Sequence, residues 1–413
     1  MKPRVILFYT VTAIFWFSLY TYVPYVAPYA EDMDANHRLI GLIAGSYGFT
    51  QMAIRFPLGI FSDKIGKRKI FVILGMFFAA VAGFLVFFAP SPYTLLLARS
   101  LGGVAASAWV AFTVLGASHY PEGQTAKVMG HLSACNAVGR MLALLGGALL
   151  AWFIGFEFSF LLGGVAGVLG IFLSCLVKEA RQARGGNRGG VSEAEHALEA
   201  GSRLPAHEKT PPSKEGPKIT ELLAVAKNKQ LLACSILGIL TMFVSFATTF
   251  GFVPIAAVSL EASPFHIGLL GVVSAGTGIL FSPLAGTVMP KKIGVCATLV
   301  IGFLLSATGS AFIAVAGSLW MLFLVQIVGS IGLAILGTLL LGLCIHDIPA
   351  ARRATAMGFY QAVYGIGMFL GPFVAGQISH AFNLNAAFIF TGTVGILGAI
   401  FTVIYTKKGH LVY

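Results

Sequence analysis

Charged residues are scarce in this chain. Asp, Glu, Lys and Arg together make up only 10% of the 413 residues, whereas 57% are hydrophobic. An ordinary soluble domain carries about a quarter charged residues, so this composition excludes a typical soluble protein. It predicts a polytopic membrane protein instead.

Several chemical signatures are also missing. The five cysteines show neither metal-ligand spacing nor paired positions in loops, so we expect no disulfide framework and no metal site. The sequence contains no phosphate-binding loop and no nucleophile and base arrangement. ATP-driven transport and enzymatic catalysis therefore lack support, and we expect a protein that is not an enzyme and uses no cofactor.

Long apolar windows are what the sequence does contain. Each has about 20 residues or more, which is enough to cross a hydrocarbon core roughly 30 Å thick. We predict an all-α membrane protein with twelve transmembrane helices, near residues 5–30, 39–61, 70–90, 92–116, 126–152, 158–177, 231–257, 267–289, 294–316, 319–345, 354–379 and 385–406. An even number of spans places both termini on one side of the membrane.

Basic residues gather on one side of these predicted spans. Of the 27 Lys and Arg residues, all except Arg38 and three arginines inside the apolar windows fall in tails and loops on the side of the termini. The positive-inside rule then places both termini in the cytoplasm and the protein in the cytoplasmic membrane. The positive-inside bias of a protein in the lipid bilayer accounts for the formal net charge of +12, so we expect no nucleic acid partner. We also expect a monomer.

The chain repeats itself at an offset of about 227 residues. The segment Ala126–Gly130 matches Ala354–Gly358, and Tyr22–Pro24 matches Phe252–Pro254. Internal repeats of this kind are typical of secondary transporters. The predicted units are two pseudo-symmetric six-helix bundles and a cytoplasmic linker between them: residues 1–177, residues 231–413 and residues 178–230.

A charged hinge lies between the second and third predicted spans. Its spacing is Gly59-x-x-x-Asp63-Lys64-x-Gly66-Lys67-Arg68-Lys69. This spacing resembles the corresponding loop of the major facilitator superfamily of secondary transporters, in particular its bacterial drug and metabolite exchangers. The resemblance implies that Gly59, Asp63, Gly66 and Arg68 form a cytoplasmic gate. The alternative is an ordinary positive-inside turn, which explains the basic residues but not the Asp and Gly at these offsets.

Two further motifs concern coupling and direction. Arg99, followed by Gly102 three residues later, resembles the fourth-span motif of the superfamily's drug-type proton exchangers, which implies a role in proton coupling. The alternative is an Arg99 that snorkels to the surface or holds backbone carbonyls. Gly130 and Gly139 resemble the antiporter motif of the fifth span, but Arg140 stands where that motif has proline. Antiport and efflux are therefore indicated only in part.

Three arginines, Arg55, Arg99 and Arg140, fall inside the predicted spans, whereas all 15 Asp and Glu residues fall in loops or at span ends. An arginine near the bilayer centre costs roughly 2.5 to 3.5 kcal/mol, so each needs a water-filled cavity, hydrogen bonds or an anion. We expect Arg55 and Arg99 to act in gating or coupling. The interior of the predicted bundle is therefore positively charged.

The fifth predicted span has two distinct faces. Ser133, Asn136 and Arg140 form a polar face. A separate stripe contains only small residues, namely Gly139, Ala143 and Gly146. Small residues let a neighbouring helix approach closely, so we expect the polar face to look into a central cavity, where Arg140 binds a negative group of the substrate. The alternative is an Arg140 that bridges to carbonyls of a neighbouring broken helix.

Other candidate residues are aromatic or polar. Trp16 and Tyr20 lie four residues apart near mid-membrane, where they either line a pocket for a ring-bearing solute or pack in the core. Gln361 and Tyr364 place polar groups inside the eleventh predicted span and are further candidates for substrate binding. His131 is expected near the inner end of its span, where it either changes its charge during transport or serves as a hydrogen-bonded structural residue.

These residues predict a secondary active transporter that moves a small organic solute by alternating access. The positive interior favours an anionic or zwitterionic solute. Coupling to protons is implied by the resemblance; since no carboxylate is expected in the cavity, the proton must be carried by His131, by Asp63 or by the solute. Two alternatives stay open: a multidrug-type proton-coupled exporter of amphiphilic compounds, and a membrane sensor that has a transporter's fold but does not transport.

Overall fold

The computed structural model describes residues 3–65, 67–120, 125–177, 179, 227–349, 352–409 and 411. Its first half contains α1 (Pro3–Tyr20), α2 (Val23–Asp32), α3 (His37–Ile65), α4 (Arg68–Phe87), α5 (Pro92–Ser107), α6 (Trp109–Ala117), α7 (Thr125–Phe153) and α8 (Glu157–Leu176). Its second half contains α10 (Lys229–Ala247), the π-helix η1 (Thr248–Phe252), α11 (Val253–Ser259), α12 (Pro264–Thr287), α13 (Met289–Ile293), α14 (Val295–Ile313), α15 (Leu319–Leu343), α16 (Arg353–Ala381) and α17 (Leu384–Lys407). The predicted linker lies outside the described residues except at residue 179 and from residue 227 onward.

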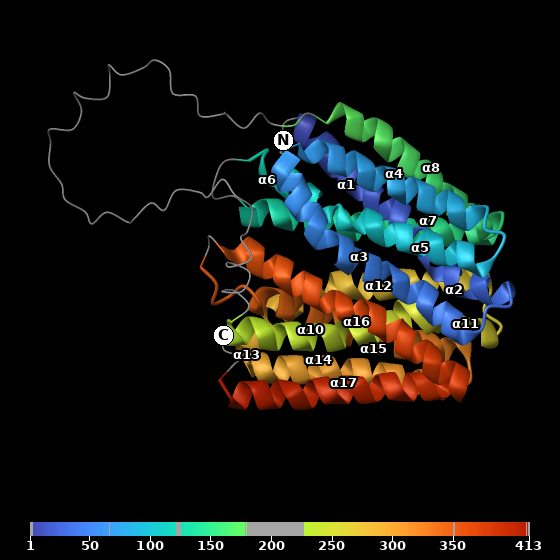
Figure 1. Ribbon diagram of the computed structural model, residues 1–413. Helices are drawn as coiled ribbons and strands as arrows, with labels where there is room; N and C mark the ends of the chain where they lie inside the picture. The colour runs from blue at the N-terminus through green and yellow to red at the C-terminus, as the bar shows by residue number, and fades with distance from the viewer. Residues whose placement is uncertain are drawn as a thin grey trace, which may run out of the picture.

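Eleven segments of the described chain are long and apolar enough to cross a membrane. The remaining predicted span corresponds to α3, a helix of 29 residues whose apolar pattern is interrupted by Gln51 and Arg55. This helix still runs along the bundle beside α5 and α16 (Figure 1). The predicted all-α fold of twelve membrane-spanning helices in two bundles is therefore confirmed.

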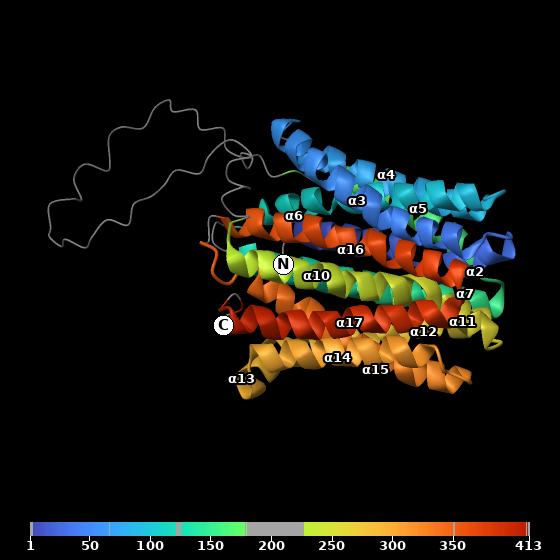
Figure 2. The same ribbon diagram turned by 60° about the horizontal axis from the view of Figure 1, so that its bottom comes forward.

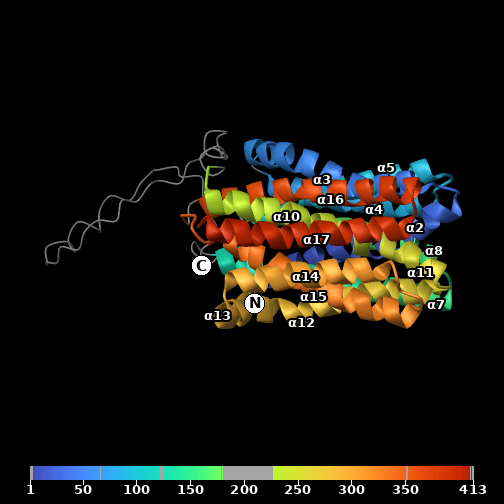
Figure 3. The same cartoon turned by 90° about the horizontal axis from the view of Figure 1, so that it is seen from below.

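The helices lie roughly along one common axis in all three views (Figures 1, 2 and 3). Figure 2 shows α3, α4 and α5 on one flank and α14 and α15 on the other, with α10 and α16 between them. The first residues of α1 and the last residues of α17 lie at the same end of the bundle (Figure 1). We call this end the terminal face and the other end the opposite face.

Both halves break their first helix at matched positions. Pro24 occupies the first turn of α2, after α1 has ended at Tyr20. Pro254 occupies the first turn of α11, directly after the π-helix η1. A proline has no N–H to continue a helix, and it restrains the residue before it. The predicted repeat between Tyr22–Pro24 and Phe252–Pro254 is thus also a repeat of backbone structure.

Three of the predicted windows are therefore interrupted rather than continuous helices. The window at 5–30 contains α1 and α2, and the window at 231–257 contains α10, η1 and most of α11. The window at 92–116 is divided at Ala108, between α5 and α6. Hydropathy reports how long an apolar segment is, but not whether the helix bends within it.

The two halves touch closely near the opposite face. Gly41 in α3 packs directly on Gly376 in α16, and a side chain at either position would collide with backbone atoms. His37 adds a polar link between the halves, because its Nδ1 lies 2.6 Å from Ser379 Oγ in α16. Its Nε2 lies 3.3 Å from Oε1 of Glu31, which belongs to the same half as His37. This end of the bundle is closed between α3 and α16.

Three glycines farther from the opposite face have open space beside them. Apart from the glycine's own helix backbone, no described atom lies within 4 Å of where a Cβ would stand on Gly130 in α7, Gly278 in α12 or Gly358 in α16. In contrast, Gly268, near the start of α12, packs against Ala148 in α7. The halves therefore meet closely at the opposite face, both between α3 and α16 and between α7 and α12.

Candidate central binding cavity

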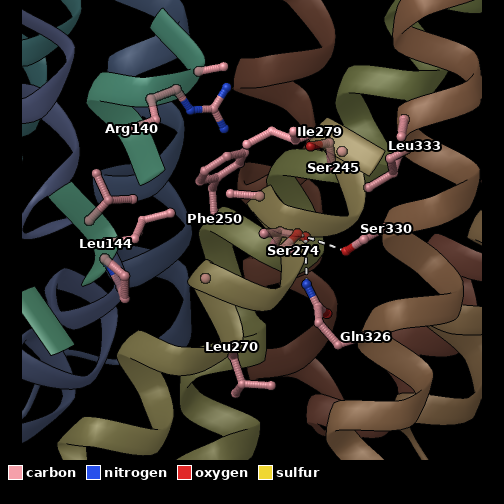
Figure 4. A pocket seen from close by; sticks show the side chains of 18 of the residues that line it. Arg140, Leu144, Ser245, Phe250, Leu270, Ser274, Ile279, Gln326, Ser330 and Leu333 are labelled. Atoms are coloured by element: carbon pink, nitrogen blue, oxygen red, sulfur yellow. Dashed lines mark hydrogen bonds between the residues drawn. The ribbon is translucent and has the colours of Figure 1, made fainter. Parts of the chain in front are cut away.

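A cavity of about 480 Å³ lies between the two halves. One wall is formed by α7, and the other walls are formed mainly by η1, α12 and α15, with smaller contributions from α2, α10 and α11. Figure 4 shows Arg140 and Leu144 approaching from α7, with Phe250 beside them and Ser274, Gln326 and Ser330 on the other side. The volume lies in the range of pockets that bind small organic molecules.

Arg140 is the charged residue among the described lining residues. Its guanidinium carbon lies 4.4 Å from the centre of the Tyr20 ring and 5.8 Å from the centre of the Phe250 ring. Its Nε atom is buried and has no hydrogen-bond partner in the described chain. Such cation–π contacts stabilise an arginine by about 0.5–2 kcal/mol without neutralising its charge. The cavity wall therefore carries a positive charge with no carboxylate beside it.

The other residues of the two predicted faces of the fifth span lie on the sides of α7 that the sequence predicts. Ser133 and Asn136 line the cavity together with Arg140. On the small-residue face, an added Cβ at Gly139 would collide with the backbone of Ala13 in α1, and Ala143 is fully buried. The predicted direction of the polar face is confirmed, whereas substrate binding by these residues stays a prediction.

The second half contributes uncharged polar groups to the cavity. Ser274 in α12 and Ser330 in α15 share a hydrogen bond of 2.7 Å between their hydroxyl oxygens. The Gln326 side-chain amide donates to Thr249 Oγ1 in η1 over 3.1 Å. Ser245 in α10 also lines the cavity. This wall can donate and accept hydrogen bonds but bears no charge.

Sequence reasoning did not single out Phe250 or Ser330 as site residues. Each is an apolar or small polar residue inside a hydrophobic span, a type of position that is common in membrane helices. Phe250 also lies within η1, and a π-helical turn changes the direction in which later side chains point. The π-helix is not encoded by an obvious motif, so the helical phase read from the sequence fails at this point.

The predicted aromatic pair is buried beside the cavity rather than in its lining. Tyr20 covers Arg140, and its ring also makes an edge contact with Phe250 at 6.0 Å. Trp16 packs against Tyr20 at 5.8 Å and against Trp109 at 5.3 Å. These rings are part of the core, and Tyr20 can affect the cavity through Arg140. Their direct contact with substrate stays a prediction.

The polar pair predicted in the eleventh span also lies elsewhere. The described lining of the cavity includes neither Gln361 nor Tyr364. The Tyr364 ring instead makes an edge contact with Tyr360 at 5.2 Å within α16. The α16 helix packs on α3 and α10, so this part of it forms an interface between helices.

The other two arginines of the predicted spans, Arg55 and Arg99, lie outside the described cavity lining. Arg99 is 3% exposed, and its guanidinium carbon stands 4.8 Å from the centre of the Tyr47 ring. One of its terminal nitrogens, Nη1, has no hydrogen-bond partner in the described chain, and the same is true of Nε of Arg55. Neither arginine snorkels to the surface, since both are buried. Their roles in gating or coupling stay predictions.

His131 takes part in a small aromatic cluster near the terminal face. Its Nδ1 lies 3.2 Å from the Tyr9 hydroxyl, which donates to the Tyr120 hydroxyl over 3.0 Å. The ring of His131 also stands edge-on to Tyr9 at 5.5 Å. His131 is therefore hydrogen-bonded within the first half, and its part in proton transfer stays a prediction.

The predicted gate lies at the terminal end of α3. Asp63 falls in the last turn of α3, but its side chain, like the whole of Gly66, lies outside the described structure. The Arg68 side chain donates to Ser62 Oγ, and its backbone N–H donates to Glu179 Oε1 over 2.5 Å. Gly59 is half-buried within α3. These two contacts tie Arg68 to the end of α3 and to the start of the predicted linker, and gating itself stays a prediction.

Comparison with known proteins places the chain in one family. Its sequence matches the Major Facilitator Superfamily over residues 8–260 and again over residues 235–410. It is 22% identical over 393 residues to an uncharacterized MFS-type transporter of Methanocaldococcus jannaschii, covering 91% of this chain and 92% of that protein. It is 26% identical over 177 residues to the quinolone resistance protein NorA of Staphylococcus aureus, covering 43% of this chain and 45% of NorA.

Solved structures agree on the fold. The crystal structure of a bacterial homolog of the human lysosomal transporter Spinster, inward-facing and unoccupied, superimposes with a TM-score of 0.78 at 15% identity. That match covers 100% of this chain and 99% of the other. At this identity the likeness concerns the arrangement of helices and not the substrate. On its sequence and its twelve-helix fold, the chain belongs to the Major Facilitator Superfamily, a family of membrane transporters and not of enzymes.

Proposed function

We propose that this protein moves a small organic anion or zwitterion across the cytoplasmic membrane by alternating access. The observation that carries the proposal is Arg140, whose guanidinium lies on the wall of the central cavity without an ion pair in the described chain. The side chain is partly buried, and its Nε is a fully buried donor without a partner. A substrate carboxylate or phosphate would supply charge-assisted hydrogen bonds to this guanidinium. The negative group of the substrate would thus pair with the Arg140 guanidinium and offset the free-energy cost of its unpaired charge.

The two six-helix units that rock in this cycle are residues 1–177 and 231–413, joined by residues 178–230. The bias of Lys and Arg places the terminal face in the cytoplasm. Close packing of Gly41 on Gly376 at the opposite face then corresponds to a state that is closed to the outside. In this proposal the solute enters or leaves from the cytoplasm in the described state.

Coupling to protons is part of the proposal. The described cavity lining contains no Asp, Glu or His, so the proton would bind away from the cavity or travel on the substrate. His131 and Asp63 are the candidates on the protein. A pH gradient across the membrane would change the rate of net flux in either case.

Flux in proteoliposomes tests the proposal. Uptake of radiolabelled organic anions, zwitterions and cations is measured with and without a pH gradient, for the wild type and for Arg140→Gln. Hydrogen bonds to a charged group contribute about 1.5–3 kcal/mol, so anion flux should fall roughly tenfold to a hundredfold in the variant. Arg38→Gln, which alters an exposed arginine, is the matched control and should transport normally. Wild-type anion flux in Arg140→Gln contradicts the proposal.

A second function is favoured by the similarity to NorA and by the mostly apolar residues of the cavity wall. It is export of amphiphilic drugs. Expression in a sensitive bacterial host, with growth measured in the presence of a quinolone, distinguishes the two. Resistance that survives Arg140→Gln supports the exporter, because binding would then depend on apolar contacts and not on the cation.

A further inference from the structure

The cavity has two chemically different ends. Arg140 provides the only charge of the described lining, and it comes from the first half. Ser274, Gln326 and Ser330 come from the second half and are uncharged. In Figure 4 the Phe250 ring stands between Arg140 and these three residues. A ligand that fills the cavity therefore meets a cation at one end, an aromatic ring in the middle and neutral polar groups at the other end.

The hydrogen-bond inventory of the neutral end defines what it can bind. The amide nitrogen of Gln326 donates to Thr249 Oγ1, while no group of the described chain donates to its amide oxygen. The bond between Ser274 and Ser330 uses one hydroxyl proton, and within the described residues the other proton has no acceptor. An amide oxygen accepts and a hydroxyl proton donates. This end therefore matches a group that does both, such as a hydroxyl or an amide.

The absence of charge at this end excludes other groups. A second carboxylate would be buried against hydroxyls without a cation, and an ammonium would be buried without a carboxylate. Burial of an unpaired ion costs far more than burial of a hydrogen-bonded neutral group. Phe250 in turn favours an apolar or ring-shaped segment in the middle of the ligand.

We infer that the substrate is a monoanion that carries an uncharged hydrogen-bonding group at the end remote from its negative charge, with an apolar segment between. This inference rests on the proposed function and narrows it, since dianions and zwitterions no longer qualify. Arg140 binds the anion, Phe250 packs on the middle, and Ser274, Ser330 and Gln326 bind the neutral end.

A matched set of probes tests this order of groups. The dissociation constants of five compounds are measured by calorimetry on the full-length protein in nanodiscs. The compounds are 4-hydroxyphenylacetate, phenylacetate, 2-(4-hydroxyphenyl)ethanol, tyramine and 1,4-phenylenediacetate. A buried hydrogen bond should make 4-hydroxyphenylacetate bind about fivefold to tenfold tighter than phenylacetate. The neutral alcohol, the amine and the dianion should each bind at least tenfold more weakly than 4-hydroxyphenylacetate.

Variants test whether Ser274 and Ser330 cause the tighter binding of 4-hydroxyphenylacetate. In Ser274→Ala/Ser330→Ala the advantage of 4-hydroxyphenylacetate over phenylacetate should fall below twofold. Thr391→Ala is the control, because this buried hydroxyl of the second half donates to Ala387 O within its own helix, and the advantage should persist. Retention of the advantage in the double variant, or tightest binding of the dianion or the amine, overturns the inference.

Arg140→Gln separates this inference from the proposed function. If the variant loses binding of both monoanions but the wild type shows no preference for the hydroxyl, only the inference fails. If no anion binds the wild type, or if Arg140→Gln changes no dissociation constant, the proposed function fails as well. The expected result is loss of both monoanions in Arg140→Gln and loss of the hydroxyl preference alone in Ser274→Ala/Ser330→Ala.

Discussion

Arg99 in the first half and Gln326 in the second half lie 227 residues apart, which is the offset of the internal repeat, yet their surroundings differ. The Arg99 guanidinium lies over the Tyr47 ring, and its Nη1 has no hydrogen-bond partner in the described chain. Gln326 is equally buried, but its amide donates to Thr249. The first half thus presents cations on aromatic rings, whereas the second half presents neutral hydrogen-bonding groups.

This difference shows that the two halves share their backbone structure but not the chemistry of their side chains. Both halves break their first helix before a proline, at Pro24 and Pro254, so the backbone plan is shared. Rocking of two bundles requires this shared backbone and does not require matched side chains. The cavity between the halves can therefore be chemically asymmetric while the motion stays nearly symmetric.

Closure at the opposite face is where the two halves depend on each other most, so the largest effect is expected there. In Gly376→Leu the new side chain would collide with the backbone of His37 and Gly41. A cost of about 3 kcal/mol to the closed state should reduce flux about a hundredfold. Flux in proteoliposomes measures the loss, and thermal unfolding checks that the variant folds.

The matched control for this variant lies on the same helix. Gly358→Leu adds the same side chain where, apart from the backbone of its own helix, nothing in the described chain lies within 4 Å, so flux should stay within about twofold of the wild type. Equal losses in the two variants would show that the effect comes from helix α16 itself and not from contact between the halves.

Arg99→Gln makes the first half resemble the second at the matched position. A buried arginine without a counter-ion in the described chain lowers stability, so the variant should gain about 1–3 kcal/mol of unfolding free energy. A higher Tm in the same detergent measures the gain, and Arg38→Gln, at an exposed position, should leave Tm unchanged. A lower Tm would mean that contacts with the surrounding aromatic rings make Arg99 more stabilising than a glutamine at this position.

The smallest effect is expected at the ring that covers Arg140. Tyr20→Leu removes a cation–π contact of about 1 kcal/mol and should raise the apparent KM for an anionic substrate about fivefold. Tyr20→Phe keeps the ring and should change KM less than twofold. A large effect of Tyr20→Phe on KM would instead show that the Tyr20 hydroxyl contributes to substrate binding. It would indicate a direct contact between this hydroxyl and the substrate.

Much of the fold follows from local features of the sequence. Apolar length predicts the spans, and the repeat predicts two bundles. The period of the α-helix predicts that Ser133, Asn136 and Arg140 share a face, and small residues such as Gly139 indicate the face that packs on a neighbour. These inferences hold because each depends on one helix at a time.

Other features depend on several helices and could not be predicted in this way. The π-helix η1 turns Phe250 toward Arg140, and Ser274 meets Ser330 only because α12 and α15 pack side by side. Trp16 and Gln361 have the residue types expected of a binding site, but packing places them outside the described cavity lining.

By itself the sequence determined that the chain is a membrane protein of twelve helices with a positive interior, because hydropathy, charge placement and internal repetition are written along one dimension. The tertiary structure decided which of the three arginines within the spans borders a cavity and which groups lie across from it. The physical reason is that burial and hydrogen-bond partners are supplied by residues distant in the chain, and only the packing of the helices brings these together.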